Sequence, residues 1–505
     1  MRLQFPTRVS IPMTVLFAGT LVVVQQFQHT GFAFSLLFFG FTVVSAITFN
    51  VAGGMSRPSG AYVLFFALLT VIAAVTLKAL VGEPADSNLE DPMLTMSVYT
   101  VGSVLLLGTV ILARRLTGEV HGLGNLLGWR QVNLTFSGLG CILVGLLIFV
   151  LDFVPLGLPA SLLSALNQLN VFLSLGLILA TVDVVSRSGG RRSLSPISIF
   201  GFLSAFLIGL GTFSKQGMFT PFLAWGIGAV YGGLRVRTIH VVSVIVSLFL
   251  MSSVLTPISQ VGRTLAEDTS LVHRLEIAFS LAATLQQTRE TEDEAYEVSV
   301  SLEGHHGYFN RNLGLGDRLA MFQIDDDLIS WTARNEPVGY APVGYYIENL
   351  IPRVFLPGKG ENEINYSGNW YAHRTGGFLG SEDVTTGISF GFLGECFAIA
   401  GWQGVFLLAP PFWLALFIIT DIVAGSLRSG PWALLPMLYF AHLAPESLVG
   451  GLIWYSWYGN ISLCLAITFC VYVAPLLGSL IGAPLAGGRE SGKYQSAAIG
   501  SAAAS

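Results

Sequence analysis

The sequence predicts an all-α polytopic membrane protein with about 12 transmembrane helices. Apolar residues make up 53% of the 505-residue chain and charged residues only 11%, and the mean hydropathy is +0.68. Apolar runs of about 20 residues recur along the chain, which is the length that a helix needs to cross a hydrocarbon layer of roughly 30 Å. Soluble globular domains do not have this composition.

The expected spans follow one another through short connections, except where one long polar segment separates the ninth span from the tenth. They are residues 11–28, 31–49, 61–81, 93–113, 133–151, 161–184, 195–213, 217–233, 238–257, 402–423, 431–452 and 460–483. The order predicts four regions: a nine-span region (1–257), a large extracytoplasmic lobe (258–386), a re-entrant helix with the C-terminal spans (387–485) and a flexible cytoplasmic tail (486–505).

Basic residues of the short loops set the expected orientation. With a cytoplasmic N-terminus, Arg114 and Arg115 and also Arg191 and Arg192 lie on the cytoplasmic side, as the positive-inside rule requires. Both termini are then cytoplasmic, and the first apolar run is a retained span rather than a cleaved signal peptide. The four cysteines all lie in apolar stretches, so neither a disulfide framework nor a metal site is expected.

The polar lobe contains nineteen of the 30 acidic and nine of the 25 basic residues. Apolar spacing predicts helices over residues 271–290 and 313–331, whereas Gly339 to Thr386, rich in Gly, Pro and Asn, is expected to be an ordered irregular loop. We expect the carboxylates in the front part of the lobe, up to about residue 335, to be solvated.

The apolar run after the lobe, residues 387–423, would be about 55 Å long as one helix, which is too long for an ordinary span. It therefore predicts a shallow or re-entrant outer helix, a break near Gly401 and then a true span. Thr385 or Thr386 would cap the outer helix. One helix face would carry Gly387, Gly391, Gly394 and Glu395. That face lacks side-chain bulk and would admit another helix or a polyprenyl chain.

Two cations near the end of the lobe are candidates for binding a phosphate or diphosphate. Arg353 follows Pro352 on a rigid turn and offers bidentate donors, although an ion pair with a nearby glutamate is the structural alternative. Lys359 lies between two glycines, where a flexible backbone would let it approach an anion. Its alternative role is that of a solvated loop lysine.

Two further cations belong to the membrane-proximal outer surface in the expected orientation. Lys215 lies on a short outer loop, on the same side as Arg353, and is either a snorkelling anchor or part of the site. Arg263 lies just outside the ninth span, at head-group height. It would bind either lipid phosphates in general or the diphosphate of a substrate.

The candidate general bases are Glu395, His373, Asp383 and Glu382. A carboxylate in an apolar helix costs several kcal/mol unless it is paired, so Glu395 is expected to have a partner or a role. A structural ion pair with Lys215 or Arg353 is the alternative. His373 is placed beside Arg374 in a glycine-flanked loop, where a histidine is commonly just solvated.

The motifs resemble those of one membrane enzyme family over about residues 205–405. They are Ile351-Pro352-Arg353-Val354-Phe355-Leu356-Pro357-Gly358-Lys359, then Thr385-Thr386-Gly387-Ile388-Ser389, then Gly394-Glu395 with Gly401 and Gly404, and the turn Phe213-Ser214-Lys215-Gln216-Gly217. In order and spacing they are similar to the polymerases that join lipid-linked oligosaccharide repeat units, the O-antigen and exopolysaccharide polymerase group.

The resemblance implies a glycosyltransferase at the outer face of the bacterial plasma membrane, with no cofactor and no metal. Its expected substrate is an undecaprenyl-diphosphate-linked oligosaccharide held among membrane lipids. A chain-length regulator protein is a further partner that the resemblance allows, and nucleic acid is not an expected partner. The diphosphate would be held by Arg353, Lys215, Arg263 and Lys359. Glu395 or His373 would accept the proton of the attacking hydroxyl.

Three other functions remain open from the sequence. An O-antigen ligase uses the same donor but transfers the finished chain to a different acceptor. A lipid-linked oligosaccharide flippase would be expected to show internal repeats and broken mid-membrane helices, which the sequence does not display. A non-enzymatic scaffold would leave Glu395 without an obvious role.

Overall fold

The computed structural model describes residues 2–153, 166, 170–265, 270–287, 289–290, 307–310, 316, 319–351, 365–375 and 388–482. Every regular element in these ranges is a helix, apart from a single bridge between Arg2 and Arg235. The chain forms two compact units. Unit 1 comprises Met1–Phe5, Leu123–Val246 and Ser462–Ser505, and unit 2 comprises Pro6–Gly122 and Ser247–Ile461.

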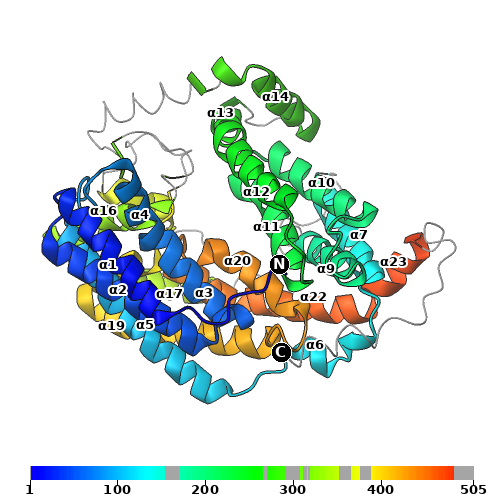
Figure 1. Cartoon of the computed structure of the whole chain (residues 1–505), viewed down its shortest axis with the longest axis horizontal. Coiled ribbons are helices and arrows are strands. Elements are labelled where there is room, and N and C mark those ends of the chain that lie inside the picture. The colour runs from blue at the N-terminus through cyan, green and yellow to red at the C-terminus, as the bar shows by residue number, and fades with distance from the viewer. Residues whose placement is uncertain are drawn as a thin grey trace. The chain divides into compact units, whose positions relative to one another are not determined.

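Unit 1 is a bundle whose helices approach one another through glycines. It contains α6 (Leu123–Leu126), η3 (Trp129–Gln131), α7 (Leu134–Phe153), α9 (Phe172–Arg187), α10 (Pro196–Gly211), α11 (Lys215–Tyr231) and α23 (Ala474–Gly482). α7 packs against both α9 and α23 (Figure 1). A Cβ on Gly140 would lie 2.2 Å from the carbonyl oxygen of Ala474, and one on Gly176 would lie 2.7 Å from that of Gly138. Small residues at such crossings are typical of helix packing in membranes.

Unit 2 contains the N-terminal helices, the helices of the polar lobe and most of the helices that follow the lobe. They are α1 (Ile11–Phe27), α2 (Phe32–Ala52), η1 (Gly54–Ser56), α3 (Pro58–Ala67), η2 (Leu68–Ile72), α4 (Ala73–Val81), α5 (Pro92–Thr117), η4 (Met251–Leu255), α13 (Thr256–Leu265), α14 (Leu271–Ala283), α16 (Met321–Arg334), α17 (Ala341–Glu348), α18 (Gly368–Thr375), α19 (Phe392–Ala424), η6 (Pro431–Ala433), α20 (Leu434–Leu443), α21 (Val449–Trp454) and η7 (Tyr455–Gly459). The remaining helices, α12 (Thr238–Leu250) and α22 (Asn460–Tyr472), cross the division between the units.

The core of unit 2 is aromatic. Tyr62, Phe66 and Tyr99 stack in sequence, and Trp413 from α19 packs edge-on against Phe66. The indole N–H of Trp413 donates to the Tyr62 hydroxyl at 3.0 Å, so this fully buried polar pair is satisfied. The cluster fixes α3, α5 and α19 to one another.

Six described helices are long and apolar enough to cross a membrane. They are Phe32–Ser56, Pro58–Val81, Pro92–Thr117, Leu134–Leu151, Thr238–Arg263 and Phe392–Ala424. The bent pair Val449–Tyr472 and Ala474–Ile481 would be a seventh, whereas α1 and α10 are apolar but shorter. The described residues are therefore all-helical, and their long apolar helices agree with the expected membrane protein. The count of twelve spans is not shown, and it stays a prediction together with the orientation and the lobe boundaries.

The predicted break at Gly401 is confirmed. Ala400 and Gly401 have non-helical backbone angles, and Gly401 adopts the left-handed region with φ 58°, which glycine tolerates best. The break divides α19 into a short first arm (392–399) and a long second arm (402–424). The carbonyl groups that the break frees on Ala398 and Ile399 accept the backbone N–H groups of Val338 and Gly339, both at 2.9 Å.

The predicted glycine face is wrong in its extent, but one of its two expected neighbours, another helix, does lie against it. Residues 388–391 are not helical and the helix begins at Phe392, so a continuous face from Gly387 to Glu395 does not exist. A Cβ on Gly391 or on Gly394 would lie 2.5 Å from the Asp325 carboxyl group. The space that these glycines leave is filled by a side chain of α16, so another helix, rather than a polyprenyl chain, occupies it.

The lobe is more helical than its sequence suggested. The first expected helix (271–290) is confirmed over α14, and the second (313–331) is displaced to α16, 321–334. The segment expected to be irregular contains the short helices α17 and α18. Pro342 stands at the start of α17, where its missing N–H is harmless.

Five helices of unit 2 begin against a carboxylate that comes from a different segment. Backbone N–H groups at or just before these helix starts donate to Asp86 at α2, Asp421 at α3, Asp326 at α5, Asp325 at α19 and Glu395 at α21. A helix N-terminus has unpaired N–H groups and the positive end of the helix dipole, so it stabilises a buried anion. Four buried carboxylates, those of Asp325, Asp326, Glu395 and Asp421, therefore lie at the positive ends of helices.

Candidate functional site

Glu395 joins four helices of unit 2. It lies in the first turn of α19 and is fully buried. The hydroxyl of Tyr346 on α17 donates to Oε1 at 2.6 Å, and the N–H of Val449, the first residue of α21, donates to Oε2. The expectation that Glu395 has a partner is confirmed, and its hydrogen-bond donors are a tyrosine hydroxyl and a backbone amide.

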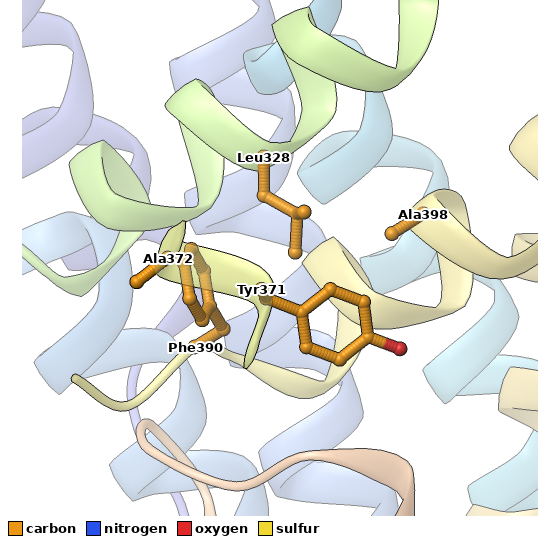
Figure 2. Packing of buried hydrophobic residues seen from close by; sticks show 5 residues of the cluster. All are labelled: Leu328, Tyr371, Ala372, Phe390 and Ala398. Atoms are coloured by element: carbon orange, nitrogen blue, oxygen red, sulfur yellow. The ribbon is translucent and has the colours of Figure 1, made fainter. Parts of the chain in front are cut away.

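Tyr371 on α18 brings the fourth helix to the same carboxyl group. Its ring is fully buried among Leu328, Phe390 and Ala398, and its hydroxyl points away from Ala372 and Phe390 (Figure 2). The hydroxyl lies close enough to Glu395 to interact with it electrostatically, but among the described residues it makes no hydrogen bond of regular geometry. Burial, followed by the negative charge of Glu395, raises the pKa of both Tyr371 and Tyr346.

Asp325 and Asp326 of α16 hold the starts of two membrane helices. Asp325 accepts the Tyr99 hydroxyl at 2.7 Å and the N–H groups of Gly391 and Gly394 at 2.6 and 3.2 Å. Asp326 accepts the Thr95 hydroxyl at 2.6 Å and the backbone N–H groups just before α5. The expectation of solvated carboxylates in the front of the lobe is wrong here, because Asp325, Asp326 and Asp327 are all buried.

Burial raises the pKa of Asp325 and of Asp326 to about 6, although the hydrogen bonds that they accept oppose the shift. The folded protein then binds these protons more tightly than the unfolded chain does. Their contribution to stability is fully present below about pH 4, is lost as the pH rises to about 6 and is constant above that. We therefore expect the stability difference between wild type and Asp325→Asn to change over this window, as thermal unfolding at several pH values would measure.

The exposed carboxylate Glu336 provides the control for this titration. A Glu336→Gln variant makes the same kind of change at an exposed side chain that takes part in none of these buried hydrogen bonds, so its stability is the reference at each pH. If the difference in stability between the wild type and Asp325→Asn does not change from pH 4 to 7, the raised pKa of Asp325 is contradicted.

His373 and Arg374 lie in the last turn of α18, directly after the buried Tyr371 and Ala372. Both side chains are exposed. The Arg374 guanidinium lies over the rings of Trp331 and Trp370, at 4.9 and 5.3 Å from their centres, which is a cation–π arrangement. The structure thus places His373 on the same short helix as Tyr371, but not in contact with Glu395.

The structure describes two of the four expected diphosphate ligands. Arg353 and Lys359 lie outside the described residues, as do the alternative bases Glu382 and Asp383. Arg263 is exposed on α13 in unit 2. Lys215 is buried at the start of α11 in unit 1, where Ser214 caps the helix. Their roles stay predictions. In the described part of the chain, no three His, Cys, Asp or Glu side chains gather as metal ligands.

Sequence reasoning missed Tyr346, Tyr371 and the aspartate pair. The signal for the aspartates was available, since Asp325-Asp326-Asp327 interrupts an apolar helix pattern between Phe322 and Leu328. Three consecutive acids in such a pattern indicate a buried polar role when the flanking residues face a core.

Comparison of the chain with family models, with curated proteins and with solved structures gave no match in any of the three.

Proposed function

We propose that this protein is a membrane glycosyltransferase that polymerises undecaprenyl-diphosphate-linked oligosaccharide units into a surface polysaccharide. The growing chain would leave its lipid diphosphate and bond to a hydroxyl of the next lipid-linked unit. The leaving diphosphate needs positive charge around it, and the attacking hydroxyl needs a base. The sequence offers both kinds of residue between residues 351 and 395.

One observation carries the proposal: Glu395, which belongs to the Gly394-Glu395 motif, joins helices that flank the other candidate residues. α17 ends at Glu348, shortly before Pro352-Arg353 in the sequence, α18 carries His373, and the first turn of α19 contains Glu395. Tyr346 and Tyr371, from α17 and α18, meet at the Glu395 carboxyl group. The motif residue Glu395 and the helix of the candidate base His373 therefore share one buried point of attachment in unit 2.

The burial of the two candidate bases suggests different roles for them. Glu395 is enclosed by its donors and fully buried, so we propose that it positions α17, α18 and α21 rather than touching the substrate. His373 is exposed and can be reached by a substrate hydroxyl, so it is the proposed proton acceptor. Arg353 is the proposed main ligand of the diphosphate, with Lys359, Arg263 and Lys215 as further candidates.

Replacing Arg353 with Ala should lower the rate of chain lengthening by about 100-fold or more, because one charged donor at a developing negative charge contributes on that order. The assay is incubation of the purified full chain with an undecaprenyl-diphosphate-linked repeat unit, followed by separation of the products by length. Arg334→Ala is the matched control, since Arg334 is a lobe arginine that pairs with Glu90 at 3.2 Å and is 62% exposed. Unchanged product length in Arg353→Ala would contradict the assignment of Arg353 as a diphosphate ligand.

Two further variants separate catalysis from positioning. His373→Ala should reduce polymerisation by about 100-fold, as loss of a general base does, and should leave the unfolding temperature unchanged because its side chain is exposed. Glu395→Gln should lower both the unfolding temperature and the rate, because it weakens the attachment of several helices. If His373→Ala polymerises normally while Glu395→Gln is inactive but stable, the two roles are reversed.

The same assay separates the alternatives. A ladder of products from a single repeat unit supports a polymerase, whereas one transfer of a finished chain to a different acceptor indicates a ligase. Movement of the lipid-linked unit across a vesicle membrane without a new glycosidic bond indicates a flippase.

A further inference from the structure

Unit 1 contains a large cavity at one end of its helix bundle. Its volume is about 1020 Å³, which is at the upper end of the roughly 300–1,000 Å³ of small-molecule sites. The walls come from the start of α7, the end of α9, the start of α10 and the end of α23. All of these segments belong to unit 1, and none of them carries a residue of the proposed glycosyltransferase site.

The mouth of the cavity is basic. Arg187, Arg191 and Arg192 line it together with a single acid, Asp183. Asp183 is already engaged, because it pairs with Arg187 at 2.9 Å and accepts the Thr135 hydroxyl at 2.5 Å. Within the described residues the guanidinium groups of Arg191 and Arg192 have no hydrogen bond or ion pair, and both side chains are exposed. The mouth therefore keeps two positive charges that no described residue neutralises.

The loop that carries these two arginines is well defined. Gly189 and Gly190 both adopt positive φ, 61° and 83°, which turns the chain sharply after α9. The Ser188 hydroxyl accepts the N–H of Arg192 at 2.9 Å, and the N–H of Arg235 donates to the Gly190 carbonyl at 2.9 Å. Arg191 and Arg192 are thus held at the mouth of the cavity by a loop whose backbone conformation is well defined.

The interior of the cavity is apolar. Leu139 and Leu143 from α7 and Ala180 from α9 form the inner wall, and the lining of α7 extends from Thr135 to Leu143, roughly 12 Å along the helix. Phe200 and Ile481 complete the wall and are 45% and 53% exposed. Exposed apolar side chains beside a membrane-spanning helix are suited to contact with lipid chains, so the interior is accessible from the bilayer.

We propose that this cavity binds one anionic phospholipid of the bilayer, with the phosphate at Arg191 and Arg192 and part of an acyl chain along Leu139 and Leu143. Basic pockets between membrane helices bind anionic head groups in this way. Arginine suits a phosphate because its planar group donates two parallel hydrogen bonds. The apolar depth explains why the ligand is a lipid and not a free anion.

Binding of fluorescent phosphatidylglycerol to the purified full chain in a nonionic detergent tests the proposal. We expect saturable binding that unlabelled phosphatidylglycerol displaces, and that phosphatidylcholine, which has no net charge, displaces at least about tenfold less well. The double variant Arg191→Gln, Arg192→Gln should bind about tenfold more weakly or worse, since each basic residue near a lipid surface contributes on the order of a fivefold effect.

The matched control is Arg130→Gln, Arg237→Gln, which removes the same charge from exposed arginines of unit 1 that do not line the cavity. It should bind phosphatidylglycerol as the wild type does. Equal losses in the two double variants would show general surface attraction and would overturn the proposal, as would an unchanged affinity in Arg191→Gln, Arg192→Gln.

A third variant tests the apolar part. Leu143→Trp should fill the interior and weaken phosphatidylglycerol binding, while inorganic phosphate should compete only weakly with the lipid in the wild type. If inorganic phosphate displaces the lipid at equal concentration and Leu143→Trp has no effect, the site recognises a free anion and the lipid assignment is wrong. If Leu143→Trp does not fold, the comparison of the two arginine double variants still tests the proposal.

Discussion

An Asp325→Ala variant is expected to lose about 3 kcal/mol or more of folding free energy. Three buried donors, the Tyr99 hydroxyl and the N–H groups of Gly391 and Gly394, would then have no acceptor. Each buried donor left without a partner costs roughly 1–3 kcal/mol, and three donors are affected together. Thermal unfolding of the purified protein in detergent, followed by intrinsic fluorescence, measures the effect.

The control for Asp325 removes only one of its three donors. Tyr99→Phe keeps the ring that packs against Phe66 and Phe322 and loses a single hydrogen bond, so it should cost about 1 kcal/mol. If Asp325→Ala is no less stable than Tyr99→Phe, then Asp325 does not hold the start of α19 in the way that its contacts indicate.

Gly394→Ala is expected to have the second largest effect, at or above the upper end of the roughly 1–3 kcal/mol typical of an overpacked core. The added Cβ would lie 2.5 Å from Cγ of Asp325 and 2.7 Å from both carboxylate oxygens. Asp325 cannot move aside without breaking its hydrogen bonds to Tyr99 and Gly391. The variant should therefore weaken the cap of α19 as well as the packing, and its unfolding temperature should fall clearly.

Gly108→Ala in α5 makes the same chemical change where there is space. No atom lies within 4 Å of the added Cβ at this position, and alanine is the better helix former by up to about 1 kcal/mol. The control should be neutral or slightly stabilising, opposite in sign to Gly394→Ala. Equal destabilisation by both substitutions would mean that the loss at Gly394 does not come from Asp325.

The sequence was sufficient for features that depend on one continuous segment. The break at Gly401 could be predicted because the apolar run from 387 to 423 exceeds one membrane thickness, and a glycine is the natural place for a turn. Helix type and the approximate ends of α2, α5 and α7 followed from apolar length in the same way. The shorter helices of the lobe could not be placed as well, because they depend on contacts with α19.

The site was predicted only in part, for a related reason. An unpaired Glu395 would be costly in an apolar helix, so a partner was expected, but its identity depends on Tyr346 and Val449, both about fifty residues away along the chain. Asp325 finds its donors at Tyr99, more than two hundred residues earlier. Backbone N–H groups occur at every residue except proline, so no sequence pattern marks those that will receive a distant carboxylate.

The first arm of α19 is attached at both ends to the same stretch of chain. Asp325 holds the N–H groups at its start, and Val338 and Gly339 bind the carbonyl groups of Ala398 and Ile399 at its end. When either attachment opens, the other keeps the two pieces at a high effective concentration, so closing is intramolecular and fast. The arm and residues 321–339 therefore form one cooperative unit, whose amide hydrogens should exchange with solvent together and more slowly than those of the exposed ends of α17 and α18.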